Sequence, residues 1–200
     1  MSETRLVLDW DGTVTEVDGL HLVLLEFGDA EIYKAHESRL GRELTLQEVI
    51  AGEFESVRTP LPEVVEWMRE NARLRAGFPD FARRHRPLIV SSGFHELIEP
   101  VLEREGLELE VHANRLDPRP DGWRVLFRPQ ALCAVCGERC KRSDVRGLDG
   151  FVYVGDGYSD RCVAEAATRV FARDGLAAYL AERGIEFEPF TDFLDLETRL

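Results

Sequence analysis

The sequence predicts an α/β fold, a Rossmann-like doubly wound parallel sheet with a helical cap inserted after the first strand. Apolar runs typical of buried strands occur at 6–8, 88–90 and 151–154, separated by stretches of helical periodicity. Such alternation is typical of a parallel sheet covered on both faces. Between the first two runs, residues 17–75 show only helical spacing. We therefore expect this segment to lie outside the sheet as a cap.

Four helices are expected in the cap, because apolar residues recur there at intervals of three and four. They cover 17–27, 30–40, 46–57 and 63–74. Thr45 and Glu48 fit a capping box at the start of the third helix, and prolines mark the start of the fourth. We assign residues 16–76 to the cap and residues 1–15 and 77–200 to the core.

After the cap, the pattern alternates between helices and strands. The expected elements are a helix over 78–86, a strand over 88–90, a helix over 94–105, a strand over 107–113, a hairpin over 115–128, a short helix near Lys141, a strand over 151–154, a helix over 159–167, a strand over 170–172 and two further helical stretches. Ligands bind at the carboxyl ends of strands in such sheets. The polar loops 9–13, 91–93 and 155–160 should therefore meet at one edge of the sheet.

Length and charge limit the function classes. A chain of 200 residues fits one domain or one domain with an insertion. Its net charge of -13 argues against binding to nucleic acid or to an anionic membrane. No apolar run approaches the length of about 18 residues that spans a membrane, and the first residues do not resemble a signal peptide. We expect a soluble cytoplasmic protein.

The first strand ends in two carboxylates, Asp9 and Asp11, followed by Gly12 and Thr13. In strand geometry the two acids point to the same side. Burying both at one point is costly unless a cation compensates them. Gly12 allows a sharp turn and lets its N–H group approach an anion.

Two other interpretations apply to such a stretch. The first is an ordinary strand end followed by an Asp-Gly turn. The second is an EF-hand calcium loop, which requires Gly at its sixth position and Glu at its twelfth. Those positions hold Val14 and Leu20, so the calcium loop is excluded.

Together, the three loops and Lys141 supply the groups that phosphoryl transfer requires. Asp9 would attack phosphorus, and Asp11 would protonate the leaving oxygen and then activate water. Mg²⁺ would be held by Asp9, the backbone carbonyl of Asp11 and Asp156. The phosphate oxygens would be bound by Gly12, Thr13, Ser91, Ser92 and Lys141. Ser159 and Asp160 would orient Lys141 or a metal-bound water. Taken singly, Ser91 also fits a helix N-cap and Lys141 a surface lysine.

These motifs resemble those of the haloacid dehalogenase (HAD) superfamily of phosphatases. Its four motifs are matched by 9–14, Ser91, Lys141 and 155–160. An aspartate at position 11 is typical of the phosphatases and mutases of this superfamily. The helical insert, together with the segments 89–94 and 113–116, is similar to the phosphoserine phosphatase-like branch. The resemblance implies a HAD core, a cap and Mg²⁺-dependent hydrolysis of a small phosphorylated metabolite.

Within that branch two groups fit. The segments 46–54, 72–78 and 171–174, together with the cysteines just before Lys141, are similar to the MtnX-like phosphatases of methionine salvage, which act on 2-hydroxy-3-keto-5-methylthiopentenyl-1-phosphate. Phosphoserine phosphatases use a cap arginine, which would fall near 51–53, where the chain has Ala-Gly-Glu. Asp18 would match their cap glutamate. We favour the MtnX-like group, with phosphoserine or another small phosphometabolite as the alternative substrate.

The residues that follow the first motif admit two interpretations. Glu16, Asp18 and His21 follow the first motif and would line the substrate pocket, or else form a solvated hinge and cap core.

Transfer to an acceptor other than water and a non-catalytic binding role are the rival functions. The chain would be a monomer or a homodimer, with no nucleic-acid or membrane partner.

The cysteines precede Lys141 closely. Cys133, Cys136 and Cys140 have the spacing of a zinc knuckle at their start, with Cys162 or a histidine as the fourth ligand of a structural Zn²⁺. Free thiols in a reducing compartment and a disulfide formed by oxidation are the alternatives. In each case the loop leads into Lys141 and influences where that side chain points.

Overall fold

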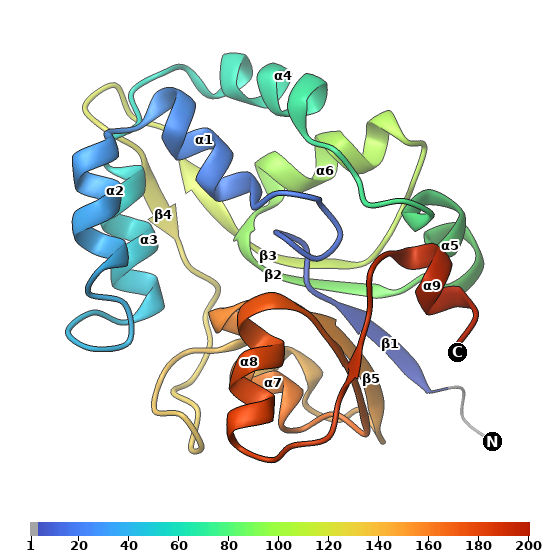
Figure 1. The fold of residues 1–200 in the computed structure, drawn as a ribbon. Coiled ribbons are helices and arrows are strands. Elements are labelled where there is room, and N and C mark those ends of the chain that lie inside the picture. Colours follow the sequence, from blue (N-terminus) through green and yellow to red (C-terminus); the bar gives the residue numbers. More distant parts are fainter. Residues whose placement is uncertain (1–3) are drawn as a thin grey trace.

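The computed structural model describes residues 4–200, which form a seven-stranded sheet flanked by helices (Figure 1). The strand order is β4-β3-β2-β1-β5-β6-β7, and all neighbours run parallel except the antiparallel pair β3 and β4. The strands are β1 (Arg5–Leu8), β2 (Leu88–Phe94), β3 (Val111–Asp117), β4 (Arg124–Leu126), β5 (Phe151–Gly155), β6 (Arg169–Ala172) and β7 (Glu188–Pro189). This confirms the predicted α/β fold with a doubly wound parallel sheet.

Helices account for most of the remaining regular structure. They are α1 (Gly19–Phe27), α2 (Ala30–Glu37), α3 (Leu46–Phe54), α4 (Leu61–Asn71), α5 (Phe78–His85), α6 (His95–Arg104), α7 (Arg161–Ala164), α8 (Asp174–Glu182) and α9 (Phe193–Glu197), with 3₁₀ helices η1 (Lys141–Val145) and η2 (Tyr158–Asp160). The capping box between Thr45 and Glu48 is present at the start of α3. Among residues 4–200, no helix has both the length and the apolar character needed to cross a membrane.

The sheet buries apolar side chains on both faces because side chains alternate along each strand. Leu6 and Leu8 of β1 pack into a core with α5, α6 and α9, whereas Val7 faces the opposite core, which α7 and α8 cover. Nearly continuous apolar strands such as β5 follow from this double coverage.

The chain reverses its winding at the centre of the sheet. β1 pairs with β2 on one side, where Leu8 lies opposite Ile89, and with β5 on the other, where Leu8 lies opposite Val154. This is the topological switch point, where α/β sheets bind ligands beyond the carboxyl ends of their strands. The loops after β1, β2 and β5 therefore meet there, as the sequence predicts.

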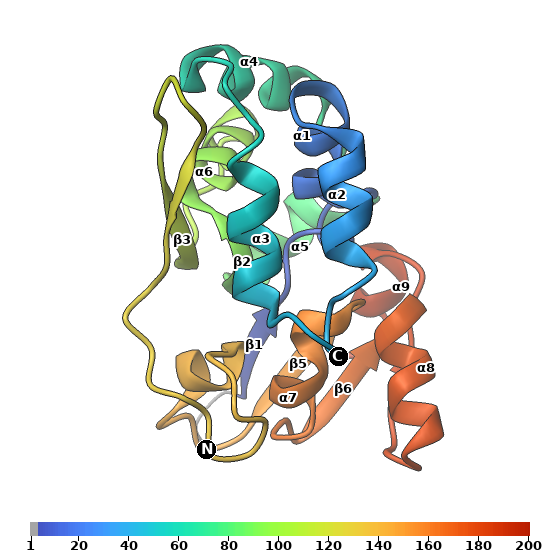
Figure 2. The ribbon, with the colours of Figure 1, turned by 90° about the vertical axis from the view of Figure 1, so that its left-hand side faces the viewer.

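The helices of the predicted cap, α1 to α4, lie together beyond this edge of the sheet (Figure 1). Figure 2 shows α2 and α3 side by side, and α4 packs against α6 of the core. Phe54 of α3 joins the two regions. Its ring contacts that of Phe94 edge-to-face, with 4.8 Å between the ring centroids, and stacks on that of Trp123, with 6.3 Å between the centroids. The division into core and cap remains a prediction.

The two linkers between these regions pair with each other. The Glu16 N–H donates to the Arg73 carbonyl at 2.9 Å, and the Arg75 N–H donates to the Val14 carbonyl at 2.8 Å. Thr15 and Leu74 form an antiparallel bridge between them. The chain therefore leaves and re-enters the core at one place.

Some element boundaries differ from the predicted ones. The strand expected over 107–113 runs from Val111 to Asp117, because the Leu107 N–H still donates to the Leu102 carbonyl and closes the end of α6. The helix expected over 159–167 is divided into η2 and the short α7. The short β7 was not predicted, since two residues carry no detectable alternation.

Candidate active site

Asp9 and Gly12 lie where β1 ends. Asp9 is buried, and its N–H donates to the Val154 carbonyl at 2.9 Å, which continues the pairing with β5. Gly12 has a φ of 79°, and a side chain there would collide with the Asp156 carboxylate. The Gly12 N–H donates to Thr15 Oγ1 at 3.0 Å, and its contact with a phosphate remains a prediction.

Lys141 lies at the centre of the site, at the start of η1. Its buried ammonium group contacts Asp9 Oδ1 and donates to Asp160 Oδ1 at 2.7 Å. Burial alone would lower the pKa of Lys141, but the charges of Asp160 and Asp9 raise it above its usual value. Lys141 is therefore a permanent cation beside Asp9.

Asp160 is held on both carboxylate oxygens. Its Oδ1 also accepts from Tyr153 Oη at 2.7 Å, and its Oδ2 accepts from the N–H groups of Asp156 and Gly157, both at 2.9 Å. Ser159 Oγ donates to Asp160 Oδ1 at 3.3 Å. Burial raises the pKa of Asp160, but Lys141 and these donors lower it overall. Asp160 thus remains ionised and orients Lys141.

Negative charge exceeds positive charge in the site. Carboxylate oxygens of Asp9, Asp156 and Asp160 lie within 4.8 Å of one another, with Lys141 as their ammonium partner. Burial and then the repulsion from Asp160 raise the pKa of Asp9 well above its usual range and that of Asp156 to about 6. Both carboxylate oxygens of Asp160 already accept hydrogen bonds. The carboxylates of Asp9 and Asp156 are therefore the ones available to a hard cation such as Mg²⁺.

Asp11 is held between the core and the first cap helix. Ser91 Oγ donates to Asp11 Oδ2 at 3.0 Å, while Ser91 Oγ itself accepts from the Gly93 N–H at 2.7 Å. The Gly19 N–H donates to Asp11 Oδ1 at 3.1 Å. Burial, and then the charge of Asp18, raise the pKa of Asp11 to about 7. A carboxyl group with such a pKa can both donate and accept a proton near neutral pH.

Arg75 braces the loop that carries the two acids. It donates to the carbonyls of Gly12 at 2.7 Å, Thr13 at 2.9 Å and Thr15 at 3.2 Å. Thr13 Oγ1 in turn donates to Asp156 Oδ1 at 2.7 Å. No signal in the sequence pointed to Arg75, because it lies at the end of the predicted cap, far along the chain from the loop that it contacts.

A cavity of about 340 Å³ opens from Asp9, Asp11 and Asp156 toward the cap helices. Other residues that line it are Asp18, Leu20, His21, Leu24, Tyr33, Glu37, Leu40, Leu46, Ile50, Glu53, Ser92, Gly157, Tyr158 and Ser159. Asp18 and His21 thus line this cavity, and their contact with the substrate remains a prediction. Glu16 is exposed and does not line the cavity, because it belongs to the paired linker.

Glu53 was not predicted as a pocket residue. It is only 4% exposed, and its Oε1 has no hydrogen-bond partner within residues 4–200. Burial, followed by the charges of Glu37 and Asp18, raises its pKa to about 8. The available signal was an acidic residue between Ile50 and Phe54, on the apolar side of the predicted helix.

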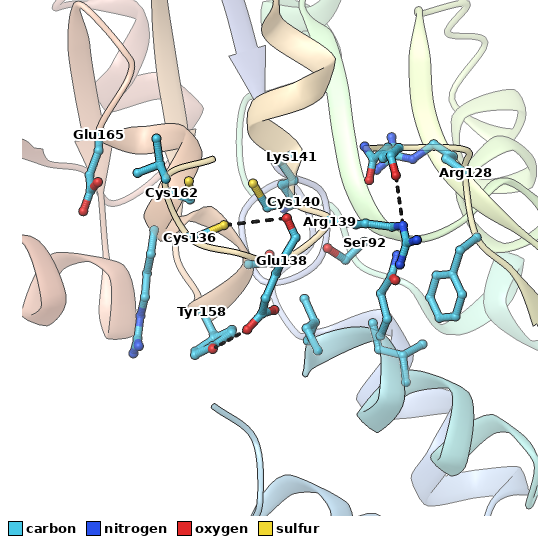
Figure 3. A pocket seen from close by; sticks show the side chains of 18 of the residues that line it. Ser92, Arg128, Cys136, Glu138, Arg139, Cys140, Lys141, Tyr158, Cys162 and Glu165 are labelled. Atoms are coloured by element: carbon cyan, nitrogen blue, oxygen red, sulfur yellow. Dashed lines mark hydrogen bonds between the residues drawn. The ribbon is translucent and has the colours of Figure 1, made fainter. Parts of the chain in front are cut away.

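A second cavity, of about 420 Å³, adjoins the first and shares Ser92 and Tyr158 with it (Figure 3). Arg128 lies in its wall, where it donates to the Ser91 carbonyl at 3.2 Å and pairs with Asp144 at 3.1 Å. The cysteine-rich loop forms much of the wall around Lys141.

Comparison with known proteins agrees with this geometry. The chain matches the haloacid dehalogenase-like hydrolase family over residues 6–165. It belongs to this family, and it is a phosphatase, a phosphoric monoester hydrolase. This confirms the resemblance to the haloacid dehalogenase superfamily that the sequence indicated.

The particular relatives are phosphatases of similar length. The chain is 32% identical to the 2-hydroxy-3-keto-5-methylthiopentenyl-1-phosphate phosphatase of Geobacillus kaustophilus, over 96% of this chain and 92% of the relative. It is 28% identical to the phosphatase of the same name from Bacillus thuringiensis, over 98% of this chain and 95% of that relative. The fold is similar to that of a substrate-bound phosphoserine phosphatase, with a TM-score of 0.74 and 17% identity over the whole of both chains.

Proposed function

We propose that this phosphatase is Mg²⁺-dependent and hydrolyses a small phosphomonoester through a phosphorylated Asp9. The observation that carries the proposal is the convergence of Asp9, Asp11, Asp156 and Lys141 at the switch point of the sheet. Asp9, the backbone carbonyl of Asp11 and Asp156 would hold the Mg²⁺. When bound there, Mg²⁺ offsets the negative charge of the phosphoryl oxygens.

In the first step, an Asp9 carboxylate oxygen forms a bond to phosphorus as the bond from phosphorus to the leaving oxygen breaks. Protonated Asp11 gives its proton to that oxygen, so the product leaves as an alcohol or enol. Lys141 stabilises the charge that develops on the phosphoryl group, and Asp160 keeps the ammonium group in place.

In the second step, Asp11 acts as a base. It takes a proton from water, and the water oxygen attacks phosphorus while the bond to Asp9 breaks. Inorganic phosphate is released and Asp9 is restored. Ser91 and Gly19 hold Asp11 in position for both proton transfers.

For the substrate, we propose the MtnX-like reaction, the hydrolysis of 2-hydroxy-3-keto-5-methylthiopentenyl-1-phosphate. The relatives of similar length carry this name. Of the residues within 4–200 that line the cavity above Asp9, none is lysine or arginine, whereas Asp18, Glu37 and Glu53 are acids and Leu20, Leu24 and Ile50 are apolar. Such a cavity suits an uncharged body with a hydroxyl group and an apolar thioether tail.

Phosphoserine is the alternative substrate, and the cavity disfavours it. Asp18, Glu37 and Glu53 would attract its ammonium group, but among residues 4–200 no lysine or arginine lines the cavity to pair with its carboxylate. The structural likeness to phosphoserine phosphatases comes with 17% identity and shows the fold alone.

The test is a comparison of kcat/KM for both phosphates with purified protein and Mg²⁺. We expect at least about tenfold preference for the methionine-salvage compound, since a desolvated unpaired charge costs more than about 1.4 kcal/mol. A preference for phosphoserine would overturn the proposed substrate. Absence of hydrolysis of either compound and of an aryl phosphate would overturn the proposed mechanism.

A further inference from the structure

We infer that Cys133, Cys136, Cys140 and Cys162 form a zinc site, distinct from the proposed Mg²⁺ site. The four Sγ atoms all lie within 4.8 Å of one another, and Cys133 Sγ and Cys162 Sγ are 3.8 Å apart. Four sulfurs around a tetrahedral zinc, each at about 2.3 Å, are separated from one another by about 3.8 Å. Figure 3 shows the sulfur atoms of Cys136, Cys140 and Cys162 gathered beside Lys141.

The loop is folded to present its first cysteine. The Cys133 N–H donates to the Glu138 carbonyl at 2.8 Å, and the Gly137 N–H donates to the Cys133 carbonyl at 2.9 Å. Gly137 has a φ of 77°, which closes the turn. The Val135 N–H lies 3.5 Å from Cys133 Sγ. An N–H group directed at sulfur favours a thiolate, the form that binds metal.

A cation also borders the fourth cysteine. Arg142 Nη1 lies 3.8 Å from Cys162 Sγ and donates to the Cys162 carbonyl at 3.2 Å. Zinc bound by four thiolates carries excess negative charge, which this guanidinium group would offset.

The rest of the loop gives a reason for a metal. Residues 127–140 form no helix or strand, and Cys136 and Val135 are exposed. A loop of this length loses conformational entropy when it is ordered, and a structural metal ion supplies the compensating free energy. Cys162 lies on α7, so the metal would join the loop to the core.

The position of the site links it to catalysis. Cys140 directly precedes Lys141, and Cys162 follows Asp160 by two residues. Zinc would therefore clamp together the two segments whose side chains meet at 2.7 Å in the Lys141–Asp160 pair. This consequence rests on the proposed role of Lys141, whereas zinc binding itself does not.

The first experiment measures metal in the untagged full-length protein by inductively coupled plasma mass spectrometry. We expect about one zinc per chain, and less than about a tenth of that in Cys136→Ser. The matched control, Leu132→Ser, changes an exposed residue of the same loop and should retain zinc. The Co²⁺-substituted protein should show thiolate-to-cobalt charge transfer and tetrahedral ligand-field bands.

Three results would overturn the zinc site: iron in place of zinc, a disulfide within the cluster, or protein without metal whose four thiols are rapidly alkylated. None of these requires the variants to fold. Each is also independent of any phosphatase assay.

The second experiment tests the clamp by activity with saturating Mg²⁺. We expect Cys136→Ser to lower kcat/KM by about tenfold or more without rescue by added Mg²⁺, and Leu132→Ser to leave it unchanged. Full activity of Cys136→Ser would overturn the clamp while zinc binding stands. An inactive wild-type protein that contains zinc would instead refute the proposed function.

Discussion

Glu53 offers a direct test of how the cap cavity treats charge. The replacement Glu53→Gln keeps the shape of the side chain and removes its titration. In the folded protein the pKa of Glu53 is raised to about 8 by burial and by Glu37 and Asp18, from a usual value of 4.5. At a pH between these two pKa values, Glu53 keeps its proton in the folded state but has released it in the unfolded state. The free energy of unfolding of the wild type therefore falls as pH rises through this window.

The difference between these pKa values limits the fall in the free energy of unfolding to about 5 kcal/mol, at about 1.4 kcal/mol per pKa unit. A small movement of the Glu53 side chain into the cavity that it lines would expose the ionised carboxylate to water and reduce this cost. We therefore expect a smaller effect, of about 1–2 kcal/mol. At acidic pH the two proteins should be about equally stable, and above about pH 8 Glu53→Gln should be the more stable one.

The assay is urea unfolding, followed by circular dichroism, at a series of pH values from about 5 to about 9. Subtraction of the wild-type curve from that of Glu53→Gln cancels the titration of the groups that do not interact with Glu53. Glu66→Gln is the matched control, because Glu66 is an exposed glutamate of the cap helix α4. Parallel stability curves for wild type and Glu53→Gln would refute the assignment of a raised pKa to Glu53.

Three further changes test the catalytic site. Asp9→Asn should abolish hydrolysis of an aryl phosphate without unfolding the protein, because it removes the attacking oxygen; measurable turnover with a near-native kcat would contradict this. Asp156→Asn should raise the Mg²⁺ concentration that gives half-maximal activity by about tenfold or more, and an unchanged Mg²⁺ titration would exclude Asp156 as a ligand. Lys141→Met should destabilise the protein by about 3–5 kcal/mol in urea unfolding, since it leaves Asp9 and Asp160 buried without their cation; a loss below 1 kcal/mol, on the scale of an exposed ion pair, would argue against that pairing.

The sequence was most informative where the chemistry is local. Asp9 and Asp11 stand two residues apart after a buried strand, so strand geometry alone places them on one side. Ser91 and Asp156 could be added because parallel strands end at one edge of a sheet, whereas Lys141 was added because it matches one of the four motifs. The fold class follows from the same alternation of strands and helices.

What the sequence missed depends on contacts between distant segments. The segment from Leu107 alternates apolar and polar residues like a strand, yet the Leu107 N–H is already bonded to the end of α6. Glu53 appeared only as a position without arginine, because its burial results from packing of α3 against the core. Arg75 reaches the Asp9 loop only through the pairing of the two linkers.

That linker pairing makes the helical insert interchangeable in principle. Since residues 14–16 and 73–75 are bonded to each other, the ends of the insert are fixed side by side whatever lies between them. Substrate preference can then change by replacement of the intervening helices while the core chemistry is preserved. Arg75 sets the boundary of such an exchange, because it supports three carbonyls of the Asp9 loop from the far linker. A chimaera that imports a foreign insert should therefore keep residues 73–75 of this chain.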